Sequence, residues 1–349
     1  MKRRAPEPLT ARRFTAWMLG LSALLAICLI LAATTGAGKV SLLDVVGWRG
    51  PLDPVDRTIF YQVRMPRVLM AALLGGSLAA AGSVFQAILR NPLADPYVLG
   101  VSGGASLGGV LALLAGVGAA SGIVGRLGVS AFAFGGALVA LVLVARMSTV
   151  HGRLTIYTML LSGAVFNAFT GALIYFIQSV ASLEELHNIV FYLIGSVPSL
   201  GYPEIAVLAA LAAACVTTLL GMTRDYNALS LGEDSAIQLG VDVERVKRRT
   251  FAAGSLLTGL AVATAGLIGF VGLVVPHVLR LVLGPDHRLL VPAAFLGGAA
   301  FLVLADLLAR WLLAPSELPV GVLTALIGGP CFLSLMRRRA PGHASTEVE

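Results

Sequence analysis

The side chains that most often carry chemistry are few in this chain of 349 residues, and they lie far apart. The five histidines show no metal-ligand spacing such as HExxH. The three cysteines, Cys28, Cys215 and Cys331, sit in separate apolar runs and form no CxxC pair. We therefore expect no catalytic residues, no metal and no cofactor, and we expect the cysteines to pack as small apolar side chains.

The sequence also lacks a nucleotide-binding loop. Its single Gly-Lys pair is Gly38-Lys39, and a P-loop would need glycine at Ala33 and serine or threonine at Val40. Within the apolar segments Asp306 is isolated, and no chain of acidic residues or histidines resembles a proton relay. If ATP drives a process here, another chain must bind it. A proton-coupled secondary transporter and a membrane-embedded enzyme stay as disfavoured alternatives.

The most polar stretch between the termini is 224–249. Gly232 can begin or bend a helix, residues 235–239 offer one helical turn, and Gly240 would end it. Two short helices joined at a glycine would make a compact knob that fits a groove on a partner. A solvated surface loop is the alternative. The apolar contacts of such a knob would be Ala236, Leu239, Val243 and Val246.

Three arginines form a second group of candidates. Arg64 and Arg67 flank a Met-Pro pair ahead of one apolar run, and Arg310 closes another. Asp306 lies four residues before Arg310, which predicts an i,i+4 ion pair. The arginines either reach toward the membrane interface, as long basic side chains do, or form a basic docking patch for acidic residues on an extracytoplasmic binding protein.

The composition places these residues in a membrane protein. The chain is 57% hydrophobic and only 12% charged, too little charge for the surface of a soluble protein of this size. Runs of about 20 apolar residues recur throughout, the length that a helix needs to cross a bilayer. The expected fold is all-α and polytopic, with about ten transmembrane helices and a short interfacial piece at 188–198. The predicted spans are 14–36, 66–89, 97–118, 122–145, 157–180, 204–222, 250–270, 272–284, 290–313 and 317–336.

Charge asymmetry predicts the orientation of these spans. With both termini inside, 18 of the 25 lysines and arginines fall on the inner side. The positive-inside rule then favours cytoplasmic termini, and the basic balance reflects topology rather than a nucleic-acid partner. We expect a tail over 1–13, a single transmembrane domain over 14–336 that includes the loop 224–249, and a tail over 337–349. The first apolar run is longer than a secretory signal and is interpreted as a retained span.

A weak internal repeat has an offset of 184 residues. The offset carries the second span onto the seventh, and a step of five spans reverses direction, so the repeat would have inverted topology. The matching residues are Gly75, Ala81, Gly82, Pro92, Leu99 and Gly100 with Gly259, Ala265, Gly266, Pro276, Leu283 and Gly284.

A transport pathway would need polar or small side chains along one helical face. Asn167 and Gln178 share such a face in the fifth span, and Thr324 lies among glycines in the tenth. Small residues at helical spacing are also typical of close helix packing. Amides in lipid are costly without a partner, which makes Asn167 and Gln178 the better pathway candidates.

Four long motifs give the sequence a resemblance to a known family. They are RMPRVLMAALLGGSLAAAGSVFQAILRNPLADPYVLGVSGG from Arg64, the LGExxAxxLG pattern over 231–240, GFVGLVVPH over 269–277 and ELPVG over 317–321. The chain resembles the FecCD-type permease subunits of ABC importers for iron-siderophores, vitamin B12 and haem, from Arg64 to Leu335. It departs from relatives at Tyr192, where tryptophan is frequent.

The resemblance implies a type II ABC importer permease in the bacterial inner membrane. Two copies would form a homodimer with substrate crossing at its axis, two ABC ATPase subunits on the cytoplasmic face and one binding protein outside. The chain itself would not be an enzyme. A ferric siderophore is the expected cargo, with cobalamin or haem as alternatives.

The resemblance also assigns roles to residues. The ATPase-coupling loop would include Leu231, Gly232, Glu233, Ala236, Leu239, Gly240 and Val243. The binding protein would dock on Arg64, Arg67 and Arg310, and the cytoplasmic gate would include Asn91, Pro92 and Leu93.

Overall fold

The computed structural model of the chain describes residues 9–35, 53–117, 123–313 and 316–337. Within these ranges the fold is all-α apart from one short hairpin. The helices before the hairpin are α1 (Ala11–Thr34), α3 (Pro54–Thr58), the π-helix η1 (Ile59–Arg64), α4 (Met65–Ile88), the 3-10 helix η2 (Pro96–Leu99), α5 (Val101–Leu114) and α6 (Ile123–Met147). The hairpin pairs β1 (Thr149–Val150) with β2 (Arg153–Leu154). The helices after it are α7 (Ile156–Val180), α8 (Leu183–Ile194), α9 (Tyr202–Gly221), α10 (Thr223–Leu229), α11 (Glu233–Gln238), α12 (Val243–Ala265), α13 (Val271–Leu283), α14 (His287–Leu312) and α15 (Val320–Arg337).

Each of the ten predicted spans corresponds to one helix, namely α1, α4, α5, α6, α7, α9, α12, α13, α14 and α15. Six of the described helices are long and apolar enough to cross a membrane by length and composition. Shorter apolar helices add to them. The 13 residues of α13 rise only about 20 Å, less than the roughly 30 Å of hydrocarbon. The prediction of an all-α polytopic fold is confirmed.

Helix α4 is the centre of the packing. Most of its side chains are buried, and it packs against α14, α12 and α13. A Cβ on Gly75 would collide with the carbonyl oxygen of Gly298 in α14, and a Cβ on Gly298 would collide with that of Gly75. These two glycines therefore let the α4 and α14 backbones approach directly.

The bounds of two predicted segments, 250–270 and 188–198, differ most from the structure. The span over 250–270 ends at Ala265, because Gly266 and Phe270 both adopt positive φ angles. The same helix begins at Val243, where the Asp242 side chain caps it, so the predicted second short helix is the first part of α12. Residues 188–194 of the predicted interfacial piece form the second half of α8, which begins after a capping box between Ser182 and Glu185 and ends at Ile194.

The repeat is only partly visible in local structure. Gly100 and Gly284 both have left-handed φ angles at helix ends, 88° and 93°. Pro92, however, lies in a loop while its counterpart Pro276 lies inside α13. The inverted repeat stays a prediction.

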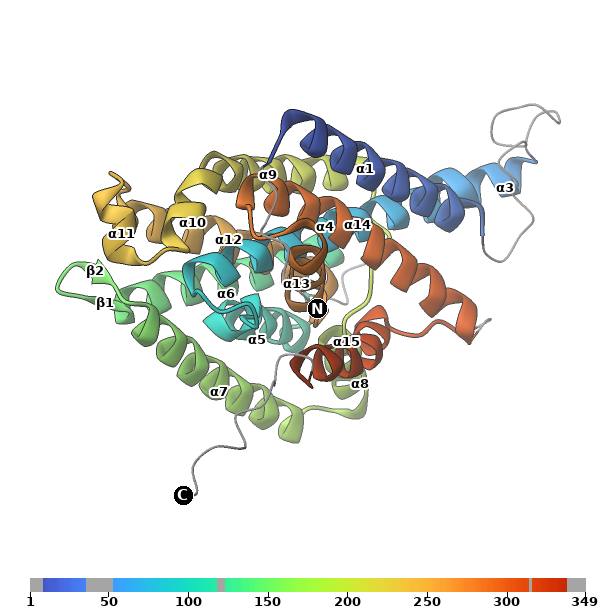
Figure 1. The fold of residues 1–349 in the computed structure, drawn as a ribbon. Coiled ribbons are helices and arrows are strands. Elements are labelled where there is room, and N and C mark those ends of the chain that lie inside the picture. Colours follow the sequence, from blue (N-terminus) through green and yellow to red (C-terminus); the bar gives the residue numbers. More distant parts are fainter. Residues whose placement is uncertain (1–8, 36–52, 118–122, 314–315, 338–349) are drawn as a thin grey trace, which may run out of the picture.

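Different helices form the two ends of the molecule (Figure 1). Helices α10 and α11 and the β1–β2 hairpin gather at one end, whereas α3 lies at the opposite end. Helix α7 runs along one side from the hairpin toward α8 and α15. The predicted coupling loop therefore lies at the opposite end of the fold from α3, and Arg64 and Arg67 follow α3 closely in the sequence.

Candidate functional site

The glycine-bounded turn at 231–240 has the local structure that its sequence predicted. Gly232 and Gly240 have φ angles of 118° and 84°, which favour glycine, and they bound α11. Ala236 faces inward and is fully buried, as is most of Val243. Leu239, which directly follows α11, is 64% exposed, unlike the other apolar residues expected to form the knob.

This otherwise polar loop exposes an apolar surface. Besides Leu239, the side chains of Leu231 and Ile237 are exposed. Three large apolar side chains exposed together around a six-residue helix form a surface suited to a protein partner. Their role in coupling to an ATPase stays a prediction.

Ion pairs fix this turn to the rest of the chain. Glu233 Oε2 lies 2.7 Å from Lys247 Nζ in α12, and Glu233 Oε1 lies 3.9 Å from Arg90 Nη2 in the elbow after α4. Glu244 Oε1 accepts hydrogen bonds from the Leu154 backbone N–H and from Arg248 Nε. The charged start of α12 thus contacts α11 and the hairpin at once. Lys247 was not among the residues singled out from the sequence.

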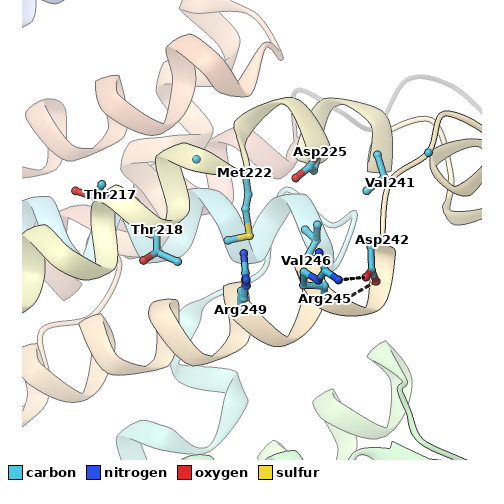
Figure 2. Close-up of a pocket in the computed structure, with 11 residues that line it drawn as sticks. Thr217, Thr218, Met222, Asp225, Val241, Asp242, Arg245, Val246 and Arg249 are labelled. Atoms are coloured by element: carbon cyan, nitrogen blue, oxygen red, sulfur yellow. Dashed lines mark hydrogen bonds and ion pairs between the residues drawn. The ribbon is translucent and has the colours of Figure 1, made fainter.

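A cavity of about 700 Å³ lies on the other side of the loop, between α9 and α12 (Figure 2). Asp242 and Arg245 form a local ion pair at its edge, with 3.2 Å between their oxygen and nitrogen atoms. Arg249 points toward Met222 across the cavity. This cavity gives the predicted coupling loop a concave surface that carries both positive and negative side chains.

Helix α10 connects this end to α14. The amide nitrogen of Asn227 donates to Asp286 Oδ1, so its oxygen is the acceptor for the His287 backbone N–H, at 2.9 Å, and for His287 Nδ1. Hydrogen bonds from Arg288 and from Asn227 lower the pKa of Asp286 to about 2, while partial burial opposes that change. The carboxylate is therefore charged throughout the physiological range.

The gate candidates occupy a tightly held elbow. Asn91 Oδ1 accepts a hydrogen bond from the Leu93 backbone N–H at 3.0 Å, which forms an Asx-type turn. The Pro92 carbonyl lies 3.2 Å from Nδ1 of the buried His277 in α13. Asn91 itself is exposed, and Pro92 and Leu93 are half-buried. The elbow is thus anchored to the GLVVPH segment, a partner that the sequence did not reveal.

Two of the three arginines, Arg67 and Arg310, bind one buried carboxylate. Asp306 is 1% exposed and lies 3.1 Å from Arg67 Nη2 and 3.0 Å from Arg310 Nε, so the predicted i,i+4 pair is present. Glu317 forms a further ion pair with Arg67 at 2.6 Å. The Arg64 side chain is buried, and the charge of Arg310 is close enough to oppose its own. In a single chain these side chains are far less exposed than the docking prediction assumed.

The pathway candidates separate into two kinds. Asn167 bridges helices, because its Oδ1 accepts from the Gly103 N–H at 3.2 Å and its Nδ2 donates to the Tyr97 carbonyl at 2.8 Å. Thr324 is fully buried and bonds to the Gly321 carbonyl of its own helix. Gln178 is half-exposed and has no hydrogen-bond partner in the part of the chain that the structure describes. Asn167 and Thr324 therefore make packing contacts, the side-chain amide of Gln178 is the freer one, and the pathway role of all three stays a prediction.

Comparison with protein families identifies the family of the chain. The model of the FecCD transport family matches residues 24–338, nearly the whole chain. The chain belongs to the FecCD transport family.

Relatives within the family share most of their length with this chain. The ABC transporter permease protein YvrB of Bacillus subtilis (strain 168) is 40% identical over 95% of this chain and 96% of its own. The hemin transport system permease protein HmuU of Yersinia pestis is 37% identical over 92% of this chain and 96% of its own. The cobalamin import system permease protein BtuC of Halobacterium salinarum is 41% identical over 79% of this chain and 73% of its own.

A solved structure has the same fold. It is an inward-facing conformation of a metal-chelate type ABC transporter, with a TM-score of 0.82 and 31% identity over 93% of this chain and 99% of that one. Membership of this family makes the chain a multi-pass permease subunit of an ABC transporter, a transport component rather than an enzyme.

Proposed function

We propose that this chain is the permease of an ATP-driven importer that carries a ferric siderophore across the bacterial inner membrane, with cobalamin or haem as the alternative cargo. The observation that carries the proposal is the exposed apolar turn around α11, held by ion pairs at the end of an otherwise lipid-suited fold. The hemin and cobalamin relatives and the metal-chelate neighbour support a large chelate as the substrate class.

The proposed assembly is a homodimer with two ABC ATPases and one binding protein. The ATPases would dock on the coupling loop 224–249, through Leu231, Gly232, Glu233, Ala236, Leu239, Gly240 and Val243. Exposed side chains would make the contact, and buried ones such as Ala236 would hold its shape. Both termini would be cytoplasmic, with the tails 1–13 and 337–349 flanking the membrane domain 14–336.

The binding protein would dock at the opposite end, over Arg64, Arg67 and Arg310. Arg67 and Arg310 both pair with Asp306, and the charge of Arg310 acts on Arg64, which supports one shared site. Acidic side chains on the binding protein would complement these arginines and set the register of docking.

The cargo would cross at the dimer axis. Gln178 is the proposed pathway amide, with Asn167 and Thr324 behind it, and the elbow at Asn91, Pro92 and Leu93 would take part in the cytoplasmic gate. ATP binding would shift the equilibrium between outward-open and inward-open states through its differential affinity for the two.

Uptake measurements test the proposal. Cells with and without the gene would be offered labelled ferric siderophores, cobalamin and haem, each with and without an uncoupler. Loss of one cargo on deletion, with uptake in the wild type persisting under the uncoupler while ATP lasts, is the expected result. Uptake abolished by the uncoupler at constant ATP would point to a secondary transporter, and no loss for any cargo would overturn the substrate class.

A further inference from the structure

Lys247 is a buried cation at the coupling end, and its position is unusual for a lysine. The residue is 6% exposed, and its ammonium lies 2.7 Å from Glu233 Oε2. Removing a lysine and a glutamate from water costs free energy that their mutual attraction only partly returns. A well-packed apolar pair would stabilise the fold equally well. The ion pair is therefore explained by the element that it holds in place.

The element that this ion pair holds in place is α11. Glu233 is the first residue of α11 and follows directly on Gly232, the residue with a φ of 118°. Because Ala236 provides the buried side chain of this six-residue helix, the orientation of α11 depends on what holds its first turn. Lys247 from α12, with a more distant contribution from Arg90, holds that turn.

The same stretch of α12 also binds the β1–β2 hairpin through hydrogen bonds. Lys247 Nζ lies 3.5 Å from the Leu154 carbonyl, and Glu244 Oε1 accepts from the Leu154 N–H at 2.8 Å. Arg248 donates to the Gly152 carbonyl in the hairpin turn. Both polar groups of the Leu154 backbone are thus bound by α12, and α7 begins two residues later at Ile156.

A cavity of about 650 Å³ lies between these elements. Glu233 and Ile237 of α11, Lys247 of α12, and Tyr157 and Leu160 of α7 all line it. Because space rather than packed side chains separates α11 from the start of α7 here, polar bridges at the cavity wall connect the two. Lys247 belongs to both bridges, one to α11 and one to the hairpin.

We infer that Lys247 is a positioning residue that couples displacement of α11 to the hairpin at 149–154 and so to α7. The inference rests on the proposed function, in which an ATPase pushes on α11. With Lys247 in place, α11, the hairpin and the start of α7 move together. Without its ammonium, α11 can move into the cavity while the hairpin stays.

The test measures the distance between α11 and the hairpin and the amount of substrate transported per ATP hydrolysed. Spin labels at Ile237 and His151, both exposed, report the separation of α11 and the hairpin in the full-length permease. ATP hydrolysis and uptake are measured on the reconstituted complex, with whichever of labelled ferric siderophore, cobalamin or haem the wild type accumulates. The variants are Lys247→Met, Glu233→Gln and the conservative Lys247→Arg. Arg146→Met removes a cation that has no ion-pair partner among the described residues and is the matched control.

Glu233→Gln is expected to broaden the distance distribution. Lys247→Met is expected to broaden it as well and to lower transport per ATP at least about fivefold, with ATPase association and hydrolysis retained. Lys247→Arg should restore both, and Arg146→Met should resemble the wild type. Unchanged distances in Glu233→Gln and Lys247→Met, or unchanged transport per ATP in a correctly assembled Lys247→Met complex, would overturn the inference. A wild type that binds no ATPase would instead refute the proposed function, while the distance measurement would still decide the role of Lys247.

Discussion

Arg67 and Asp306 lie 239 positions apart in the sequence, yet the Arg67 guanidinium contacts the buried Asp306 carboxylate at 3.1 Å. Arg310 reaches the same carboxylate and also the Ala32 carbonyl near the end of α1. One buried acid thus joins α4, α14 and α1 at the end of the fold opposite α11. The pairing explains how arginines can be buried in the wall of a membrane protein.

Asp306→Asn should destabilise the chain by about 3 kcal/mol or more, because two largely buried arginines lose the charge that compensates them. The measurement is SDS-induced unfolding in mixed micelles. Glu317→Gln is the control: its side chain is 56% exposed, and its loss should cost at most about 1 kcal/mol. Equal effects of the two substitutions would contradict a buried Asp306.

Gly75→Ala should lower stability by about 1–3 kcal/mol, since the added methyl group collides with the α14 backbone, which cannot turn aside as a side chain can. Gly135→Ala in α6 is the matched control, because a Cβ there meets nothing within 4 Å in the described structure. Thermal unfolding of both variants in detergent compares them. A neutral Gly75→Ala variant would mean that α4 and α14 are not in backbone contact.

Asn167→Leu should cost about 1–3 kcal/mol, because the Gly103 N–H and the Tyr97 carbonyl lose their partner. Gln178→Ala should change stability by less than about 0.5 kcal/mol, because the amide has no described partner. Unfolding and uptake are measured on both variants. Transport lost in Gln178→Ala with full stability would favour a pathway role, and the opposite pattern would assign Gln178 to packing.

Ile237→Ser and Leu239→Ser should each weaken ATPase association about tenfold or more while leaving the unfolding temperature unchanged, because both side chains are exposed on the coupling turn. Co-purification with the ATPase over a concentration series measures the effect. Leu183→Ser at the start of α8 is the control, being even more exposed but far along the chain from α11. If all three variants retain the ATPase equally, the turn is not its docking surface.

Asp286 gives a pH dependence with a defined sign. Its pKa falls from an ordinary 3.8 to about 2 in the folded chain, so its contribution to stability is complete above 3.8 and is lost as the pH falls through 2. The difference in unfolding temperature between the wild type and Asp286→Asn should therefore shrink as the pH is lowered over that range. A difference that stays constant with pH would show that the carboxylate charge contributes nothing.

The sequence by itself determined the features that depend on neighbouring residues. Apolar run lengths predicted the positions of the ten helices, Gly232 and Gly240 predicted the ends of α11, and the spacing of Asp306 and Arg310 predicted their ion pair. Each of these follows from backbone conformation or helical periodicity, which act within a few residues.

Only the tertiary structure decided which side chains meet across helices. The Arg67–Glu317 and Lys247–Leu154 contacts join residues 250 and 93 positions apart, and the exposure of Leu239 depends on where α11 ends. Lysine, arginine and asparagine side chains can bind many partners, and the packing of α4 against α14 and of α12 against the hairpin selects one of them. For this reason the turn around α11 was predicted from its sequence, whereas the lysine that pairs with its first residue was not.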